Sequence, residues 1–326
     1  MGKIKSVIGF EIDSSAIRAI EMTRSGDGYS VLACGKIPLA EGVIEEGFIR
    51  DADAFNLSLV ELLENGGFKA TDVVAGVNNE NVIMRYATFP KVPDDKLRNM
   101  VLLQAQEFIP IPVQEMEIDY VLAGEGVGDE DQPIVNVLIV AARRNMLEQI
   151  INILLASKLQ IIDIDSSVLA LCRALQLKAQ GKKFALLNLT DDVLNFLVVK
   201  GNDISMVRSI TIPDRVYEQV QAVFNATEDF SADKETVDAV GSMLASETAS
   251  SISYYSMQNG EEPIDDIYFI STVSCDKELA AQISEVVAAV PIEIPDLYET
   301  LNLGLDSEVV KEFSGCIGLA IQGLEG

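Results

Sequence analysis

The sequence contains no histidine and no tryptophan, and it has only four cysteines. Without histidine, the chain cannot form a Ser-His-Asp or Cys-His nucleophile pair, nor a metal site with imidazole ligands. The cysteines are far apart and form no Cys-x-x-Cys pair, since they stand at Cys34, Cys172, Cys275 and Cys316. We therefore expect free thiols in a reducing compartment.

Basic residues are scarce as well. The chain has 24 Lys and Arg against 51 Asp and Glu, which gives a formal net charge of -27. The acidic residues are scattered and no basic patch is present, which excludes nucleic-acid binding. Such a surface also repels anionic lipid headgroups, whereas it attracts a basic peptide.

Long apolar runs and a secretory signal are also missing. No run approaches the roughly 20 apolar residues of a membrane span, and the start of the chain, Met1–Lys5, lacks a long apolar segment. We therefore predict a cytoplasmic protein without direct membrane insertion. At 326 residues, with 48% hydrophobic residues, the chain is long enough for two lobes with a core each.

One pattern occurs twice in the chain. The segment Ile8–Ser15 is followed by the apolar stretch Ala16–Met22, and Leu186–Asp192 is followed by Val193–Val199. Each copy predicts a strand, a tight polar turn and a returning strand. Duplicated hairpins of this kind resemble the two turns that hold the phosphates of ATP in the actin-like fold. We therefore predict an α/β protein with two actin-like lobes, each related to ribonuclease H.

The two turns lack the residues that usually hold nucleotide. The usual turn is Asp-x-Gly, but the equivalent positions are Glu11 and Asp13 in one copy and Asn188 and Thr190 in the other. Glycine allows backbone N–H groups to approach a phosphate closely, whereas Asp13 adds a repelling negative charge. We therefore predict a degenerate nucleotide site and a protein that binds a partner rather than an enzyme, with no catalytic residues and no metal.

Two interpretations of these turns stay open at this point. Glu11, Asp13 and Asp192 could supply hard oxygen ligands to a divalent cation that carries ATP. Alternatively, Asp13 could bond to its own backbone as an ordinary turn residue. Ser14 and Ser15 suit both interpretations and do not distinguish them.

Periodicity and composition predict how the lobes are divided. The boundary between the lobes is expected at Gln180–Lys183, so the N-terminal lobe spans residues 1–180 and the C-terminal lobe residues 181–326. The predicted subdomains are a core of residues 1–84 with 160–180, an insertion of residues 85–159, a second core of residues 181–212 with 264–326, and a helical subdomain of residues 213–263. A single final helix is predicted over Glu308–Leu324.

The inserted stretch resembles that of the type IV pilus assembly protein PilM family. The resemblance rests on Val82–Pro90, on the helix end Gln104–Pro110 and on Glu115–Tyr120, where Gln104 and Phe108 depart mildly from the family pattern. It continues in Val207–Ile210 and in Gly318–Ala320. The resemblance covers essentially the whole chain and implies an inserted subdomain in the order found in the cell-division protein FtsA.

The chain departs from this family at the positions that face nucleotide. Thr211–Asp214 replaces a Gly-Gly pair, and Ser271–Val273 replaces the Gly-Gly pair that holds the adenosine. With the two turns, all four glycine sites are lost together, so no cofactor is expected. The degenerate nucleotide positions are Glu11, Asp13, Ser14, Ser15, Asn188, Thr190, Ser271 and Thr272.

The resemblance also implies a partner and a location. Family members lie at the cytoplasmic face of the inner membrane, in type IV pilus or related type II secretion-like systems. There they hold the short cytoplasmic N-terminal tail of the membrane protein PilN, between the first and inserted subdomains. Other pilus platform proteins and the assembly ATPase are further candidate partners. The groove candidates are Arg85, Tyr86, Phe89, Phe108, Ile109, Asp119 and Tyr120.

Two alternative functions remain. The first is an active actin-like ATPase with Mg²⁺-ATP, in which Glu11 holds the metal or positions water. The second is an FtsA-like protein that assembles into filaments.

Overall fold

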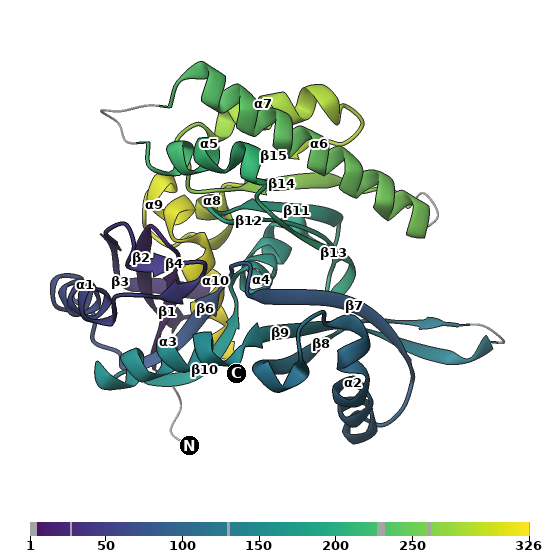
Figure 1. Cartoon of the computed structure of the whole chain (residues 1–326), viewed down its shortest axis with the longest axis horizontal. Coiled ribbons are helices and arrows are strands. Elements are labelled where there is room, and N and C mark those ends of the chain that lie inside the picture. Colours follow the sequence, from purple (N-terminus) through teal and green to yellow (C-terminus); the bar gives the residue numbers. More distant parts are fainter. Residues whose placement is uncertain (1–4, 27, 129–130, 227–231, 260–261, 326) are drawn as a thin grey trace.

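The N-terminal lobe is built on a five-stranded sheet (Figure 1). The computed structural model describes residues 5–26, 28–128, 131–226, 232–259 and 262–325, so the outer limits of the predicted lobes, residues 1 and 326, lie outside it. The strand order is β10-β6-β1-β2-β3, with β1–β3 antiparallel and with β6 and β10 parallel to β1. These strands are β1 (Ser6–Ile12), β2 (Ala16–Ser25), β3 (Gly28–Pro38), β6 (Asp72–Val77) and β10 (Gln160–Ser166).

The C-terminal lobe repeats this arrangement. Its sheet has the order β13-β12-β11-β14-β15, again with three antiparallel strands and two strands parallel to the first. These strands are β11 (Lys183–Leu189), β12 (Val193–Lys200), β13 (Asp203–Thr211), β14 (Asp266–Ile270) and β15 (Ile292–Glu293). The predicted duplication is therefore confirmed.

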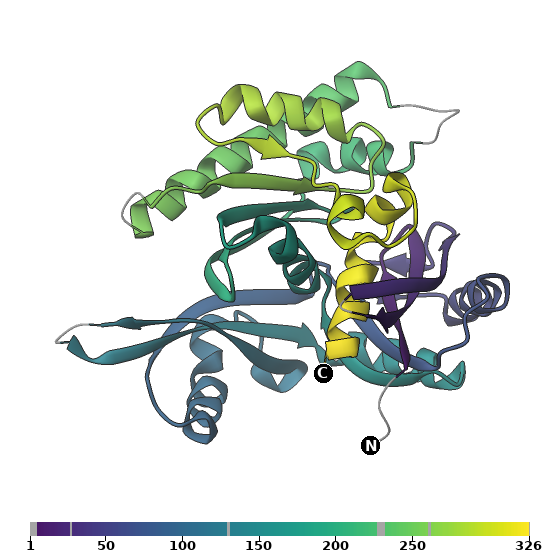
Figure 2. The ribbon, with the colours of Figure 1, turned by 180° about the vertical axis from the view of Figure 1, so that it is seen from behind.

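Helices cover both faces of the two sheets, which explains why β11 and β12 are almost continuously apolar. The C-terminal sheet packs on α5 (Asp214–Phe224), α6 (Lys234–Asn259) and α7 (Asp276–Val286), and the N-terminal sheet on α1 (Ala52–Asn65) and α3 (Arg144–Ala156). Between the sheets lie α4 (Ser167–Ala179) and α10 (Ser314–Glu325) (Figure 2). Smaller elements are β4 (Ile44–Glu45), β5 (Phe48–Ile49), α8 (Leu297–Leu301) and α9 (Ser307–Glu312).

The described helices include none that is both long and apolar enough to cross a membrane. All four cysteines are free thiols, and Cys172 and Cys316 are buried.

The insertion forms a separate three-stranded antiparallel sheet of order β7-β9-β8. It comprises β7 (Val82–Pro90), α2 (Asp94–Phe108), the 3-10 turn η1 (Val113–Glu115), β8 (Met116–Val127) and β9 (Pro133–Arg143). One face packs against α2. On the other face, Met84 and Leu138 join Ile204 of β13 in the core shared by both lobes.

The subdomain limits remain a prediction, and they can be compared with the helices and strands of the structure. The limit after residue 84 falls inside β7. The helix α3 belongs to the predicted insertion, yet its residues Met146, Ile150 and Leu154 pack in one core with Phe55 and Leu59 of α1.

The predicted final helix over Glu308–Leu324 is wrong at one residue. Phe313 leaves helical geometry, with φ -104° and ψ 15°, so the segment divides into α9 and α10. The break redirects α10 into the space between the lobes, where it packs on β1. This packing requires a glycine at position 9, because a Cβ there would lie 1.9 Å from the carbonyl oxygen of Cys316.

We expect Gly9→Ala to destabilise the protein, because α10 must move away from β1 to admit one methyl group. The free energy of unfolding should fall by about 1–3 kcal/mol, the range of a small residue enlarged in a packed core. Urea denaturation measures this change. The matched control is Gly126→Ala on β8, whose Cβ would meet nothing closer than 3.5 Å. Equal stability of the two variants would contradict the proposed close packing.

Candidate functional site

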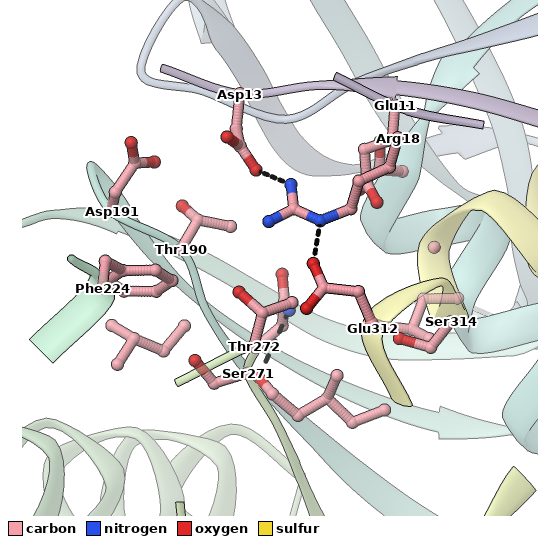
Figure 3. Close-up of a pocket in the computed structure, with 16 residues that line it drawn as sticks. Glu11, Asp13, Arg18, Thr190, Asp191, Phe224, Ser271, Thr272, Glu312 and Ser314 are labelled. Atoms are coloured by element: carbon pink, nitrogen blue, oxygen red, sulfur yellow. Dashed lines mark hydrogen bonds and ion pairs between the residues drawn. The ribbon is translucent and has the colours of Figure 1, made fainter. Parts of the chain in front are cut away.

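The two predicted turns do face each other across the cleft between the lobes (Figure 3). They enclose a small cavity of about 50 Å³, together with the loop after β14 and the junction of α9 with α10. Most of the predicted nucleotide positions meet there. The polar residues that line the cavity include Glu11, Asp13, Arg18, Ser167, Asn188, Thr190, Asp191, Ser271, Thr272 and Glu312.

Arg18 lies at the centre of this site and was missed by the sequence-based prediction. Its side chain is only 3% exposed and forms ion pairs with Asp13 and Glu312 (Figure 3). Lys36 stands beside Arg18 on the neighbouring strand and pairs with the same Glu312 at 2.8 Å. Burial disfavours the charged guanidinium, but the carboxylates outweigh this effect and raise the pKa of Arg18. The available signal was that Arg18 and Glu21 are charged residues inside the mainly apolar stretch Ala16–Met22.

Asp13 also closes the first turn through its own backbone. Its Oδ1 accepts hydrogen bonds from the backbone N–H groups of Ser15 at 2.9 Å and Ala16 at 2.8 Å. The Asx-type bonds of the second interpretation are therefore present. The other carboxylate oxygen pairs with Arg18, so Asp13 uses both oxygens within the protein.

Glu11 lies opposite Arg18 in the β1–β2 register and is partly buried. Burial raises the pKa of this carboxyl, and the charge of Arg18 partly opposes the rise. Its carboxylate packs on the start of α10, where a Cβ on Gly315 would lie 2.5 Å from Glu11 Oε2. Across the described ranges, no group of three or more acidic, cysteine or histidine side chains is arranged to hold a metal ion.

The second turn contributes two acidic residues, of which Asp191 is buried and Asp192 is partly buried. Ser14 of the first turn donates its hydroxyl to Asp191 across the cleft, and Asp191 is only 4% exposed. Burial, together with the nearby carboxylates of Asp13 and Asp192, raises the pKa of Asp191 to about 8. Burial likewise raises the pKa of Asp192 to about 6. Thr190 accepts a hydrogen bond from the backbone N–H of Val193 at 3.1 Å and so closes its own turn.

Amide side chains join the two lobes beside these turns. Asn78 of the N-terminal lobe donates to Asn188 Oδ1 at 3.1 Å and accepts a bond from Asn195 at 2.9 Å. Asn188 is thus engaged in contacts between the lobes. Ser271 and Thr272 line the opposite wall, where the hydroxyl of Ser271 is buried and has no hydrogen-bond partner among the described residues.

The seven groove candidates do not lie on one surface. Phe89 and Ile109 are core residues of the insertion, 1% and 2% exposed, and the Phe108 ring packs 6.3 Å from that of Phe89. In the β7-β9-β8 register, Arg85 and Tyr120 flank Ile139 on the face toward α2. Side chains alternate along a strand, so Tyr86 points to the opposite face. Asp119, on the edge strand β8, pairs with Arg98 of α2 at 3.3 Å. The assignment of these residues to a partner groove remains a prediction.

The paired sheets, the facing turns and the central helix define an actin-like two-lobed protein. The solved structure described as a "PilM-PilN type IV pilus biogenesis complex" superposes with a TM-score of 0.81 at 21% identity, over 98% of this chain and 99% of that one. The ethanolamine utilization protein EutJ from Carboxydothermus hydrogenoformans gives a TM-score of 0.56 at 12% identity, over 99% and 90%. These likenesses show the fold.

The family follows from a separate comparison. The family model described as "Type IV pilus assembly protein PilM" matches residues 9–307. The chain therefore belongs to the PilM family, as its inserted motifs indicated.

We expect Asp191 to make the protein less stable as pH rises. Its pKa is raised in the folded state, so between about pH 4 and pH 8 the folded protein binds more protons than the unfolded one, and stability falls with increasing pH. Asp191→Asn removes this effect. Urea denaturation at pH 5 and pH 8 should show wild type losing on the order of 2 kcal/mol more than the variant.

The control is Glu218→Gln, an exposed carboxylate on α5, which should keep the wild-type pH dependence. If Asp191→Asn kept the wild-type pH dependence, the fall in stability between pH 5 and pH 8 could not be due to Asp191.

Proposed function

We propose that this protein is a scaffold of the type IV pilus assembly platform at the cytoplasmic face of the inner membrane. Its partner is the short cytoplasmic N-terminal tail of a PilN-like membrane protein. The observation that carries this proposal is the family match over residues 9–307. A solved complex whose title names PilM with PilN shares the fold along almost the whole chain.

The charge of the chain supports this partner. Cytoplasmic segments next to a membrane span carry an excess of Lys and Arg. A protein with a net charge of -27 attracts such a segment, and this attraction accelerates encounter more than it raises affinity.

We further propose that ATP is not part of this function. The cavity between the turns measures about 50 Å³. The cavity beside it, lined by Ser15, Arg18, Thr272 and Glu312, measures about 240 Å³. Each is smaller than the usual small-molecule site of about 300–1,000 Å³. The carboxylates of Asp13 and Glu312 line the cavity between the turns and would repel a polyphosphate. The cation best placed to offset this repulsion, Arg18, is already bound to Asp13 and Glu312.

For the groove, we propose the face of the inserted sheet that carries Arg85 and Tyr120. These residues stand on the two edge strands beside α2, and Tyr120 is partly exposed next to the insertion core. A partly exposed aromatic side chain supplies apolar contact and a polar hydroxyl together, which suits recognition of a peptide.

Titration of a synthetic tail peptide into the protein tests this proposal. We expect saturable binding in calorimetry, and Tyr120→Ala should weaken it about tenfold, the effect of losing one well-packed aromatic contact. Tyr86→Ala, on the other face of the sheet, tests whether that face takes part instead. The matched control is Tyr254→Ala, an exposed tyrosine on α6, which should bind like wild type. Absence of binding at high micromolar peptide would contradict the proposed partner.

Calorimetric titration of Mg²⁺-ATP tests the nucleotide proposal separately. We expect neither heat of binding nor a rise in Tm at millimolar nucleotide beyond the effect of Mg²⁺ alone, because a ligand that binds only the folded state would stabilise it. Saturable binding that is lost in Glu11→Ala would favour the ATPase alternative instead.

A further inference from the structure

A cavity larger than that between the turns lies in the C-terminal lobe. It measures about 410 Å³, within the usual range of about 300–1,000 Å³ for small-molecule sites. Its walls are the carboxyl end of β14, the start of α7, the segment that follows β15 and the helix α9. Of the predicted nucleotide positions, Ser271 lines it, whereas the turn residues Glu11, Asp13, Asn188 and Thr190 do not.

One side of this cavity is apolar. It is formed by Ile294, Pro295, Leu297 and Val310, of which Leu297 and Val310 are buried. Such a wall holds a short hydrocarbon chain and excludes water from it, in the manner of a surface that covers the stem of a lysine. A ligand that fills this cavity would therefore contact the wall with an apolar part.

The other side is charged, with an excess of carboxylates. Asp276, Glu278, Asp296 and Glu308 line the cavity against two cations, Lys277 and Lys311. Lys311 is already bound, since its Nζ lies 2.6 Å from Asp276 Oδ2 and 3.3 Å from the carbonyl oxygen of Val273. By contrast, Glu278 and Glu308 are exposed and form no ion pair with any described residue.

The start of α7 adds no attraction for an anion. A helix N-terminus favours negative charge, but here the helix already supplies it, because Asp276 Oδ1 accepts a bond from Lys277 N at 2.8 Å and Glu278 follows in the first turn. An anionic ligand would meet the excess carboxylates, whereas a cation would be paired by Glu278 and Glu308. The charges that line the cavity thus favour a cation over an anion.

From these observations, we propose that the cavity binds an organic cation, namely an ammonium group on a short apolar chain. The apolar wall holds the chain, and Glu278 and Glu308 hold the ammonium group. A small alkyl amine and the side chain of a lysine share this chemistry. The site goes beyond the proposed tail-binding function and can be tested without any pilus partner.

The helix α9 connects this cavity to the cleft between the lobes. Lys311 lines the cavity, and the next residue, Glu312, holds Arg18 and Lys36 of the N-terminal lobe. A ligand in the cavity therefore contacts the same short helix that anchors the central ion pairs of the cleft.

Calorimetric titration with hexylamine tests the site, because its amine is protonated at neutral pH. We expect saturable binding that weakens when the ionic strength is raised from about 0.01 M to about 0.15 M, since the paired charges are exposed. Hexanol lacks the charge and hexanoate reverses it, so both should bind more weakly. Equal or tighter binding of hexanoate would overturn the proposal, and so would a complete absence of hexylamine binding.

Substitutions at the cavity test whether hexylamine binds there. The double variant Glu278→Gln, Glu308→Gln should weaken hexylamine about fivefold, as expected for the loss of two exposed ion pairs. Ser274→Trp places a large side chain at the exposed rim and should abolish binding. The matched control Glu285→Gln changes an exposed carboxylate of α7 outside the cavity and should leave the affinity unchanged. If the double variant and Ser274→Trp both bind hexylamine like wild type, the assigned cavity is wrong.

A second titration with an N-acetylated lysine amide identifies the source of the cation. Its binding, sensitive to Ser274→Trp, would assign the site to lysine side chains of a peptide as well as to free amines. Its failure to bind alongside hexylamine would assign the site to free amines.

Discussion

The structure depends on one group of charges, the buried guanidinium of Arg18 between Asp13 and Glu312. Asp13 closes the first turn through its other oxygen, and Glu312 stands where α9 ends before α10 enters the space between the lobes. Breaking a buried pair by removing one partner leaves an uncompensated charge, which is strongly destabilising. The shape of the first turn and the position of the central helix are therefore coupled through this one side chain.

The contacts between the lobes are of two kinds with different consequences. Apolar packing around α4 and α10 joins the sheets into a shared core. This packing stabilises the fold, but the hydrophobic effect is non-directional and does not fix the orientation of the lobes. The polar contacts, Ser14 with Asp191 and Asn78 with Asn188 and Asn195, fix how the turns face each other. The pKa values of Asp191 and Asp192 are raised in this position, because burial and nearby carboxylates both favour the neutral form.

The proposed functions use different parts of the fold. The cleft between the turns is small, and its arginine is paired with the carboxylates of Asp13 and Glu312, which suits a rigid connection better than a ligand site. The insertion presents the edge strands β7 and β8 beside α2, and the C-terminal lobe retains a larger cavity behind β14. A strongly acidic surface favours cationic partners at both places, since long-range attraction depends on the summed charge.

The sequence by itself determined the class of fold, because the repeated strand-turn-strand pattern and its apolar periodicity are local features that any sheet must express. It also determined the family, through the inserted motifs, and the loss of glycine from both turns. Tertiary structure decided the rest. The partners of Arg18 lie 5 and 294 residues away, the break at Phe313 depends on where α10 must pack, and the burial of Phe89 and Ile109 depends on α2. Periodicity carries no information on such distant contacts, so only the folded chain could specify them.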